Sequence, residues 1–229
     1  MSVVGQGDHA LRPGGDTVAT LTPLRRQPVQ QRSAKRVERM LEACAELVGE
    51  LGYDGVTTTL IAERAGVAVG SLYQFFPDKR AVVQALTQRN LDRFMTEIAR
   101  RLDAQAPAHW FDGADLVFDI YVQMYREVPG FSRIRFGDVV DLRLIDGERD
   151  NNTVIADGMA TLLAERFGVP FDEIRMPVAV ANEIADSILN LAFRRALFPE
   201  EQVIAEAKAV VREYLSGRTT GTGVAAAAG

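Results

Sequence analysis

The sequence predicts an all-α fold in which a compact group of short helices precedes a group of longer ones. Apolar residues recur three, four and seven positions apart along most of the chain, which is the period of an amphipathic helix. No segment alternates apolar and polar residues as a strand would. Gly and Pro residues interrupt the apolar pattern at points that suit helix ends.

Composition divides the 229 residues into four segments. Residues 1–30 are rich in Gly, Pro, Gln and Thr and show no period, so we expect a disordered arm. Residues 31–80 form the group of short helices, and residues 81–216 form the group of longer amphipathic helices. The Ala-rich residues 217–229 read as a disordered tail.

The composition also indicates where in the cell the protein is expected and whether it carries a cofactor. No apolar run approaches the roughly 20 residues of a membrane-spanning helix, and the first residues lack the apolar stretch of a secretory peptide. We therefore expect a cytoplasmic protein with no membrane partner. The lone Cys44 fits a reducing compartment, and the isolated His9 and His109 predict no zinc site and no cofactor. A metal site built from carboxylates alone stays open.

The net charge of −5 is unevenly distributed. Residues 1–80 carry ten Lys and Arg against nine Asp and Glu, whereas residues 81–229 carry 16 against 22. The acidity therefore belongs to the C-terminal part. Because affinity for a polyanion depends on local charge, the net charge does not exclude nucleic-acid binding by the N-terminal part.

The first helix is expected from about Arg32 to Leu51, with Gly52 as its stop. Cys44 lies on its apolar stripe and is interpreted as a small core residue rather than a reactive thiol. The stripe consists of Val37, Met40, Leu41, Cys44, Leu47, Val48 and Leu51.

Charge along this helix opposes the helix dipole. Basic residues, among them Arg32, Lys35, Arg36 and Arg39, lie near its start, and glutamates lie near its end. One interpretation places the basic start beside a polyanion, with residues 25–26 extending the patch. The other is an ordinary solvated face, and the pattern alone favours neither.

The stretch 57–79, TTTLIAERAGVAVGSLYQFFPDK, predicts two short helices joined by a tight turn. Thr57 or Thr58 can cap the first helix, and Gly66 suits the left-handed backbone of the turn. The second helix is expected over 69–75, Pro77 stops it, and Asp78 caps a long helix that follows. Two short helices with a glycine turn form a helix-turn-helix.

At these positions the chain resembles the DNA-binding domain of tetracycline-repressor (TetR) type regulators, over about 45 residues without a gap. Ala68 departs from the pattern, where Ser is common, and so does Gln74, where His or another polar residue is usual. The matching residues are Gly52-Tyr53, Thr57, Ile61-Ala62, Ala65-Gly66-Val67, Gly70-Ser71-Leu72-Tyr73 and Phe76-Pro77-Asp78-Lys79.

The resemblance implies that the second short helix enters the major groove of an operator. Gln74 would pair with adenine, and Ala68 and Val69 would touch a thymine methyl group. The outward positions also include Gly70 and Ser71. The residues expected to contact phosphates are Thr57, Thr58, Tyr73 and Lys79, with Arg32 and Arg36 from the first helix.

The remaining chain predicts helices separated by Pro-Gly, Asp-Gly and Phe-Pro pairs. The resemblance implies a helical ligand-binding and dimerisation domain here, and a homodimer would span two half-sites. Alternatively, the same faces pack inside one monomer. The expected helices span residues 78–102, 112–128, 131–139, 150–167, 177–198 and 199–215.

Two residue sets follow for this domain. The resemblance implies a small-molecule pocket in its middle helices, although the same residues also suit an ordinary core. The pocket set is Phe118, Tyr121, Met124, Tyr125, Phe131, Phe136 and Met159. The dimer set is Ala181, Ile184, Ala185, Ile188 and Ala192, with Val203, Ala207, Val210 and Tyr214.

These features predict a DNA-binding transcription regulator, expected to be a repressor that a small molecule of unknown identity releases from its operator. Control by a protein partner and action as an activator stay open. A helical enzyme is the remote alternative, because the sequence carries no Ser/His/Asp set, Gly-rich phosphate loop, HExxH or CxxC.

Overall fold

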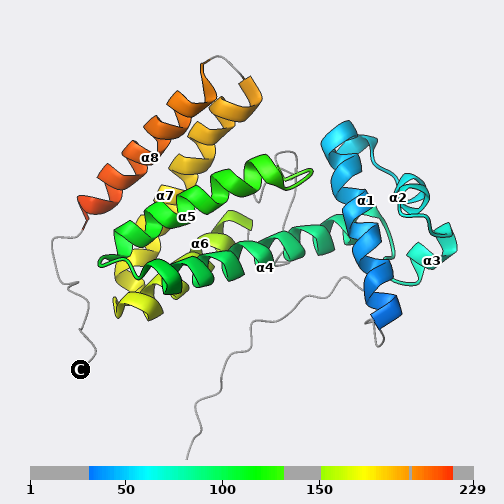
Figure 1. The fold of residues 1–229 in the computed structure, drawn as a ribbon, viewed down its shortest axis with the longest axis horizontal. Coiled ribbons are helices and arrows are strands. Elements are labelled where there is room, and N and C mark those ends of the chain that lie inside the picture. Colours follow the sequence, from blue (N-terminus) through cyan, green and yellow to red (C-terminus); the bar gives the residue numbers. More distant parts are fainter. Residues whose placement is uncertain (1–30, 132–150, 196–197, 219–229) are drawn as a thin grey trace, which may run out of the picture.

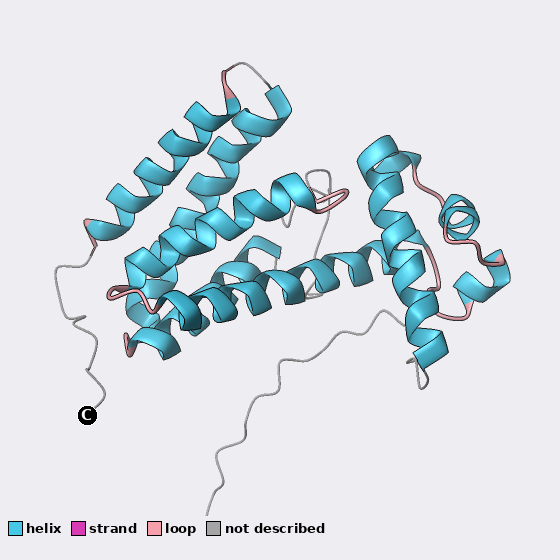
Figure 2. Ribbon diagram, viewed as in Figure 1, coloured by secondary structure: helices cyan, strands magenta, loops and turns pink. Residues whose placement is uncertain are grey.

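The computed structural model describes residues 31–131, 151–195 and 198–218, and within these ranges every regular element is a helix (Figure 2). The predicted all-α fold class is confirmed. The elements are α1 (Gln31–Gly55), α2 (Thr58–Arg64), α3 (Val69–Tyr73), α4 (Lys79–Gln105), α5 (Trp110–Glu127), α6 (Asn151–Phe167), α7 (Phe171–Asn190), a π-helical turn (Leu191–Arg195) and α8 (Glu200–Ser216).

Two groups of helices lie at opposite ends of the long helix α4 (Figure 1). Each group encloses a hydrophobic cluster. The small cluster joins α1, α2 and α3 to the first turns of α4, and Met40, Ile61, Leu72 and Phe76 at its centre are fully buried. Burying such side chains stabilises a domain by about 1.5–3 kcal/mol each, so the short helices are held by packing rather than by their own propensity.

Helix α4 belongs to both clusters. Asp78 caps it by accepting a hydrogen bond from the Ala81 backbone N–H at 2.8 Å, as the sequence predicts. Val82 and Leu86 pack in the small cluster, whereas Phe94 and Ile98 pack in the large one. A helix of 27 residues spans about 40 Å, so α4 connects the two units as one rod.

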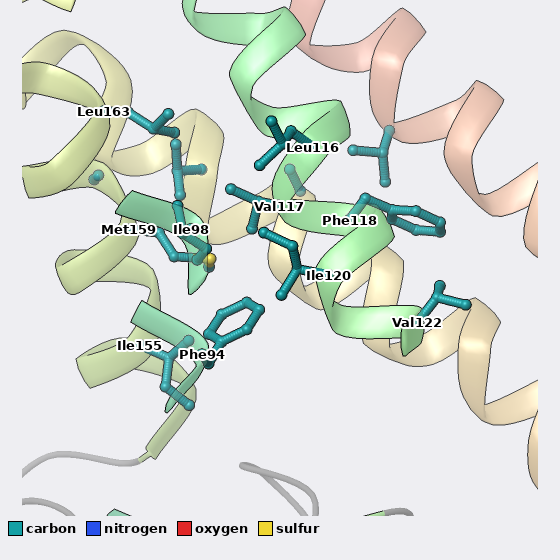
Figure 3. Close-up of a cluster of buried hydrophobic side chains, with 14 of the residues drawn as sticks. Phe94, Ile98, Leu116, Val117, Phe118, Ile120, Val122, Ile155, Met159 and Leu163 are labelled. Atoms are coloured by element: carbon teal, nitrogen blue, oxygen red, sulfur yellow. The ribbon is translucent and has the colours of Figure 1, made fainter. Parts of the chain in front are cut away.

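The large cluster is built from the second half of α4 and from α5 to α8. Figure 3 shows how it is filled: Phe94 and Ile98 meet Ile155, Met159 and side chains of α5. Helices α7 and α8 pack side by side at the far end of this unit (Figure 1).

The first helix breaks at Gly52, whose φ is 71°, as the sequence predicts, and a further turn then reaches Gly55. Leu51 beside the break is 50% exposed. Its place on the predicted apolar stripe was therefore wrong. Helix α7 begins at Phe171 rather than at Pro177, because Asp172 and its neighbour favour a first turn and the helix accommodates the proline. The helix expected over 131–139 lies outside the described residues.

Among the described residues, no helix combines the length and the apolar character of a membrane-spanning segment. Within the described ranges, no group of three or more His, Cys, Asp and Glu side chains is arranged to hold a metal ion.

Candidate nucleic-acid interface and regulatory cavity

The turn between α2 and α3 has the geometry of a helix-turn-helix. Thr57 caps α2, because its hydroxyl oxygen accepts a hydrogen bond from the Leu60 N–H at 3.2 Å. Gly66 has a φ of 64°, a left-handed conformation that favours glycine, and the Val67 N–H then donates to the Ala62 carbonyl at 2.9 Å. Both predicted roles, the cap at Thr57 and the turn at Gly66, are confirmed.

Helix α3 has one buried and one exposed face. Leu72 is fully buried, and Phe75 and Phe76, which follow the helix, are buried beside it. This anchoring fixes the orientation of a helix too short to be stable alone. The opposite face presents Ala68, Gly70, Tyr73 and Gln74 as exposed residues, with Val69 and Ser71 half-buried.

The packing of the protein does not explain why residue 70 is a glycine. It lies inside a helix, where glycine costs roughly 0.5–1 kcal/mol relative to alanine. A Cβ built on it meets nothing within 4 Å. The missing side chain is therefore unexplained by internal contacts, and it leaves the α3 backbone open to close approach from outside.

Three residues that are predicted to contact phosphates already have partners within the chain. The Tyr73 and Thr58 hydroxyls are hydrogen-bonded at 3.0 Å, which ties the exposed face of α3 to the start of α2. The Lys79 ammonium donates to the Tyr53 carbonyl at 2.9 Å and lies 4.2 Å from the centre of the Tyr53 ring. Lys79 is thus held in place at the N-terminus of α4, where backbone N–H groups suit an anion.

The charged residues at the two ends of α1 have different surroundings. Near its end, Glu46 and Glu50 bind Arg64 of α2 at 3.2 and 2.8 Å, and the Arg64 hydrogen bond lowers the pKa of Glu50. At its start, Arg36 is exposed, and it forms no ion pair with any described residue. Of Arg32, only the helical backbone is described.

A cavity lies inside the large cluster, between α4, α5, α6, α7 and α8. Its volume is about 50 Å³. None of the lining residues that the structure describes is charged, and Tyr121 and Asn182 are the polar side chains among them. The Tyr121 hydroxyl donates to Asp186 at 2.9 Å. The lining residues are Phe94, Ala114, Val117, Phe118, Tyr121, Met159, Leu163, Val178, Ala181, Asn182, Ala185, Val211 and Leu215.

The predicted pocket set is divided by this geometry. Phe118, Tyr121 and Met159 line the cavity. Met124 borders a different, polar groove between α4 and α5. Tyr125 and Phe131 are buried, and their rings contact each other and the ring of Tyr121, which lines the cavity. Phe136 lies outside the described residues.

Comparison with known proteins identifies the family. Residues 40–86 match the family described as bacterial regulatory proteins, tetR family, and residues 108–219 match the tetracyclin repressor-like C-terminal domain. The crystal structure of a TetR-family transcriptional regulator from Streptomyces coelicolor is 38% identical, with a TM-score of 0.67 over 80% of this chain and 98% of that one. The chain belongs to the TetR family of transcription regulators.

Two curated relatives are named repressors. The tetracycline repressor protein class A of transposon 1721 from Escherichia coli is 39% identical over 64 residues, 28% of this chain and 30% of that protein. The HTH-type transcriptional repressor KstR of Rhodococcus jostii is 39% identical over 59 residues, 26% of this chain and 28% of that protein. These two matches therefore cover less than a third of either relative.

In this TetR-family regulator, four of the nine predicted dimer residues are buried within the monomer. Ala181, Ala192, Val203 and Ala207 are buried, and Ala181 lines the cavity together with half-buried Ala185. This burial is the alternative that the sequence left open. Three other set members, Ile184, Ile188 and Tyr214, are partly buried against the large cluster, and Val210 is 40% exposed.

Several relevant residues escaped the sequence prediction. Asn182, Leu163, Val211 and Leu215 line the cavity, and Met176 leaves a large apolar side chain 63% exposed on α7. Small and apolar residues at helical spacing indicate burial, but they do not indicate whether the burial faces a core, a cavity or a second subunit. Only the packing of α7 against α8 makes that distinction.

Proposed function

We propose that this regulator is a repressor that binds operator DNA through α3 and releases it when a ligand enters the cavity. The observation that carries the DNA-binding part is Gly70. Gly70 is exposed, and the packing of the monomer does not require a glycine at this position of α3. This supports close contact between the α3 backbone and the floor of the major groove.

The exposed side chains around Gly70 suit the two kinds of DNA contact. We assign base reading to Gln74, whose amide can pair bidentately with adenine, and to Ala68 and Val69, which can contact a thymine methyl group. Contacts to phosphates fix the register without reading sequence. These are assigned to Thr57, Thr58, Ser71, Tyr73, Lys79, Arg32 and Arg36.

Two copies are needed to span two half-sites about one helical turn apart. We propose that the dimer face is the outer surface of α7 and α8, where Met176, Val180 and Val210 leave apolar side chains 63%, 37% and 40% exposed.

The cavity supports an uncharged ligand with an apolar body. Its described lining has no charge to neutralise an anion or a cation, whereas Asn182 and Tyr121 provide hydrogen-bonding groups. A volume of about 50 Å³ is far below the roughly 300–1,000 Å³ of occupied ligand sites, so binding must widen the cavity. That widening provides a route from ligand binding to a change in helix packing.

The DNA-binding proposal is tested by selecting sites from a random DNA library and measuring their affinity by fluorescence anisotropy at two salt concentrations. We expect salt-dependent binding of two subunits, or a multiple of two, that resists random competitor DNA. Gln74→Ala should relax the preference at one base position by about 1–3 kcal/mol. Equal, weak binding to selected and random DNA would contradict the proposal.

The ligand proposal is tested by thermal shift with an alcohol, a carboxylate and an amine on the same alkyl chain. A ligand at 100 times its Kd stabilises the folded state by about 2.7 kcal/mol. We expect the alcohol to raise the Tm most, and Asn182→Leu to reduce the shift. A response to none of the compounds would favour control by a protein partner, and a reporter gene distinguishes repression from activation.

A further inference from the structure

The turn that follows α5 touches the backbone of α1. Gly130 has a φ of 71°, and a Cβ built on it would lie 2.3 Å from the Ala45 carbonyl oxygen. A Cβ built on Gly49, one helical turn further along α1, would lie 3.3 Å from the Gly130 nitrogen and 3.6 Å from its Cα. The two units therefore meet here backbone to backbone, with a glycine on each side.

The same turn is connected to the cavity by aromatic rings. Phe131, next to Gly130, is fully buried, and its ring lies 5.6 Å from Tyr121 and 6.0 Å from Tyr125, both edge to face. Tyr121 lines the cavity and contacts Phe94 at 6.1 Å. Close-packed aromatic groups shift together rather than independently, because interiors hold little free space.

We propose that Gly130 and Gly49 are the positioning residues that couple the cavity to the DNA-binding unit. Widening the cavity moves Tyr121 against Phe131, and Phe131 shifts the Gly130 turn on α1. Helix α1 packs on α2 and α4, so its displacement alters the position of the helix-turn-helix. The absence of side chains at the contact lets the turn follow α1 without a gap. This inference rests on the proposed ligand control.

The test fills the cavity with a side chain, so it needs no ligand. Ala114→Leu introduces bulk from α5, and Ala185→Val does so from α7 if the first variant does not fold. Each is combined with Gly49→Ala, whose added Cβ would lie 3.3 Å from the Gly130 nitrogen and would push the turn away from α1 by a few tenths of an ångström. The matched control is Gly158→Ala, which adds the same methyl group inside helix α6, with Met95 Cε at 3.5 Å.

The readout is amide hydrogen exchange of peptides from residues 41–50 in the full chain, followed by mass spectrometry. Filling the cavity should speed exchange on the order of fivefold or more in the presence of Gly49. The increase in exchange rate should fall below about twofold in the Gly49→Ala background, and it should keep its full size in the Gly158→Ala background. The coupling would be overturned if filling the cavity left the exchange rate of residues 41–50 unchanged. It would also be overturned if filling had an equal effect with and without the glycine substitutions.

A second measurement uses Trp110, the only tryptophan of the chain, as a reporter of the large cluster. In urea, its fluorescence and the exchange of α1 should show coincident transitions in the wild type and separate ones in Gly49→Ala. Coincidence in both proteins would contradict the proposal. The two proposals can also be separated. If the exchange of α1 changes as predicted but filling the cavity leaves operator affinity unchanged, the proposed ligand control is contradicted, whereas the coupling contact is supported.

Discussion

Basic side chains have different surroundings on two faces of this regulator. Along the seam of α5 and α8, Lys208 binds Asp119 at 2.6 Å, and Arg212 binds Asp112 at 2.9 Å and also Asp115. At the start of α1 the cations are exposed, and no carboxylate of the described residues forms an ion pair with them. These cations are Lys35, Arg36 and Arg39.

The difference separates charges that stabilise the fold from charges available to a partner. A cation with a carboxylate partner has its charge compensated within the monomer, and an exposed pair contributes only about 0–1 kcal/mol. A cation without a partner keeps its attraction for an external anion such as phosphate. Composition does not distinguish the two, whereas the contacts do.

The largest effect is expected from removing the uncompensated cations together. Substituting Gln for Lys35, Arg36 and Arg39 should weaken operator binding on the order of a hundredfold and reduce the salt slope by about 2 to 3. The unfolding free energy should change little. Lys208→Gln is the matched control in anisotropy titrations, and an equal loss of affinity there would remove the distinction between the two faces.

Gly70→Ala should have the next largest effect, with opposite signs for folding and binding. The unfolding free energy should rise by about 0.5–1 kcal/mol, because alanine favours the helix and the added Cβ meets nothing. Operator affinity should fall roughly tenfold, because the methyl group displaces the DNA backbone or base edges. Urea unfolding and anisotropy check both, and unchanged affinity would mean that α3 does not approach DNA closely.

A smaller effect is expected on the paired face. Arg212→Ala should lower the unfolding free energy by about 1 kcal/mol and leave operator affinity unchanged. Burial raises the pKa of Asp115, and the charge of Arg212 opposes that rise. Removing Arg212 should therefore raise the pKa of Asp115 further, because the buried carboxylate loses a compensating charge. The resulting loss of unfolding free energy should be largest near neutral pH, where Asp115 is ionised, and should shrink as Asp115 is protonated at lower pH. A destabilisation independent of pH would contradict this cause.

The smallest effect concerns Cys44 in the small cluster. Burial raises the pKa of its thiol to about 12, so the thiolate that reacts is scarce at neutral pH. We expect no reaction with a thiol reagent in the folded protein at pH 8 and full reaction in urea. Rapid labelling without denaturant would show that the small unit opens under native conditions.

The DNA-binding unit could be predicted from the sequence because its signals are local. The cap at Thr57, the left-handed turn at Gly66 and the buried Leu72 lie within a few residues of the features that they determine. The ion pairs of Arg64 with the end of α1 could not be foreseen, since they join residues 14 and 18 positions apart on separate helices. The sequence alone therefore does not decide the role of the charges of α1.

The cavity and the dimer face were harder to predict for a related reason. Ala181 and Val210 both lie on apolar faces in the sequence, yet one lines the cavity and the other is exposed. Which side of a helix meets its neighbour depends on the crossing of α7 and α8, and helical periodicity carries no information on that crossing.

Helix α4 also marks where the two units divide. The buried polar residues of the described chain are Thr87 and Asn90, which lie on α4 between the two clusters. Thr87 donates to the Val83 carbonyl at 3.0 Å, and Asn90 Oδ1 has no hydrogen-bond partner among the described residues. These two polar residues interrupt the otherwise apolar buried face of α4, which makes this point a suitable junction for a chimera. Residues up to 90 could be joined to the second half of the corresponding long helix of another regulator. This would transfer the DNA-binding unit without dividing either hydrophobic cluster.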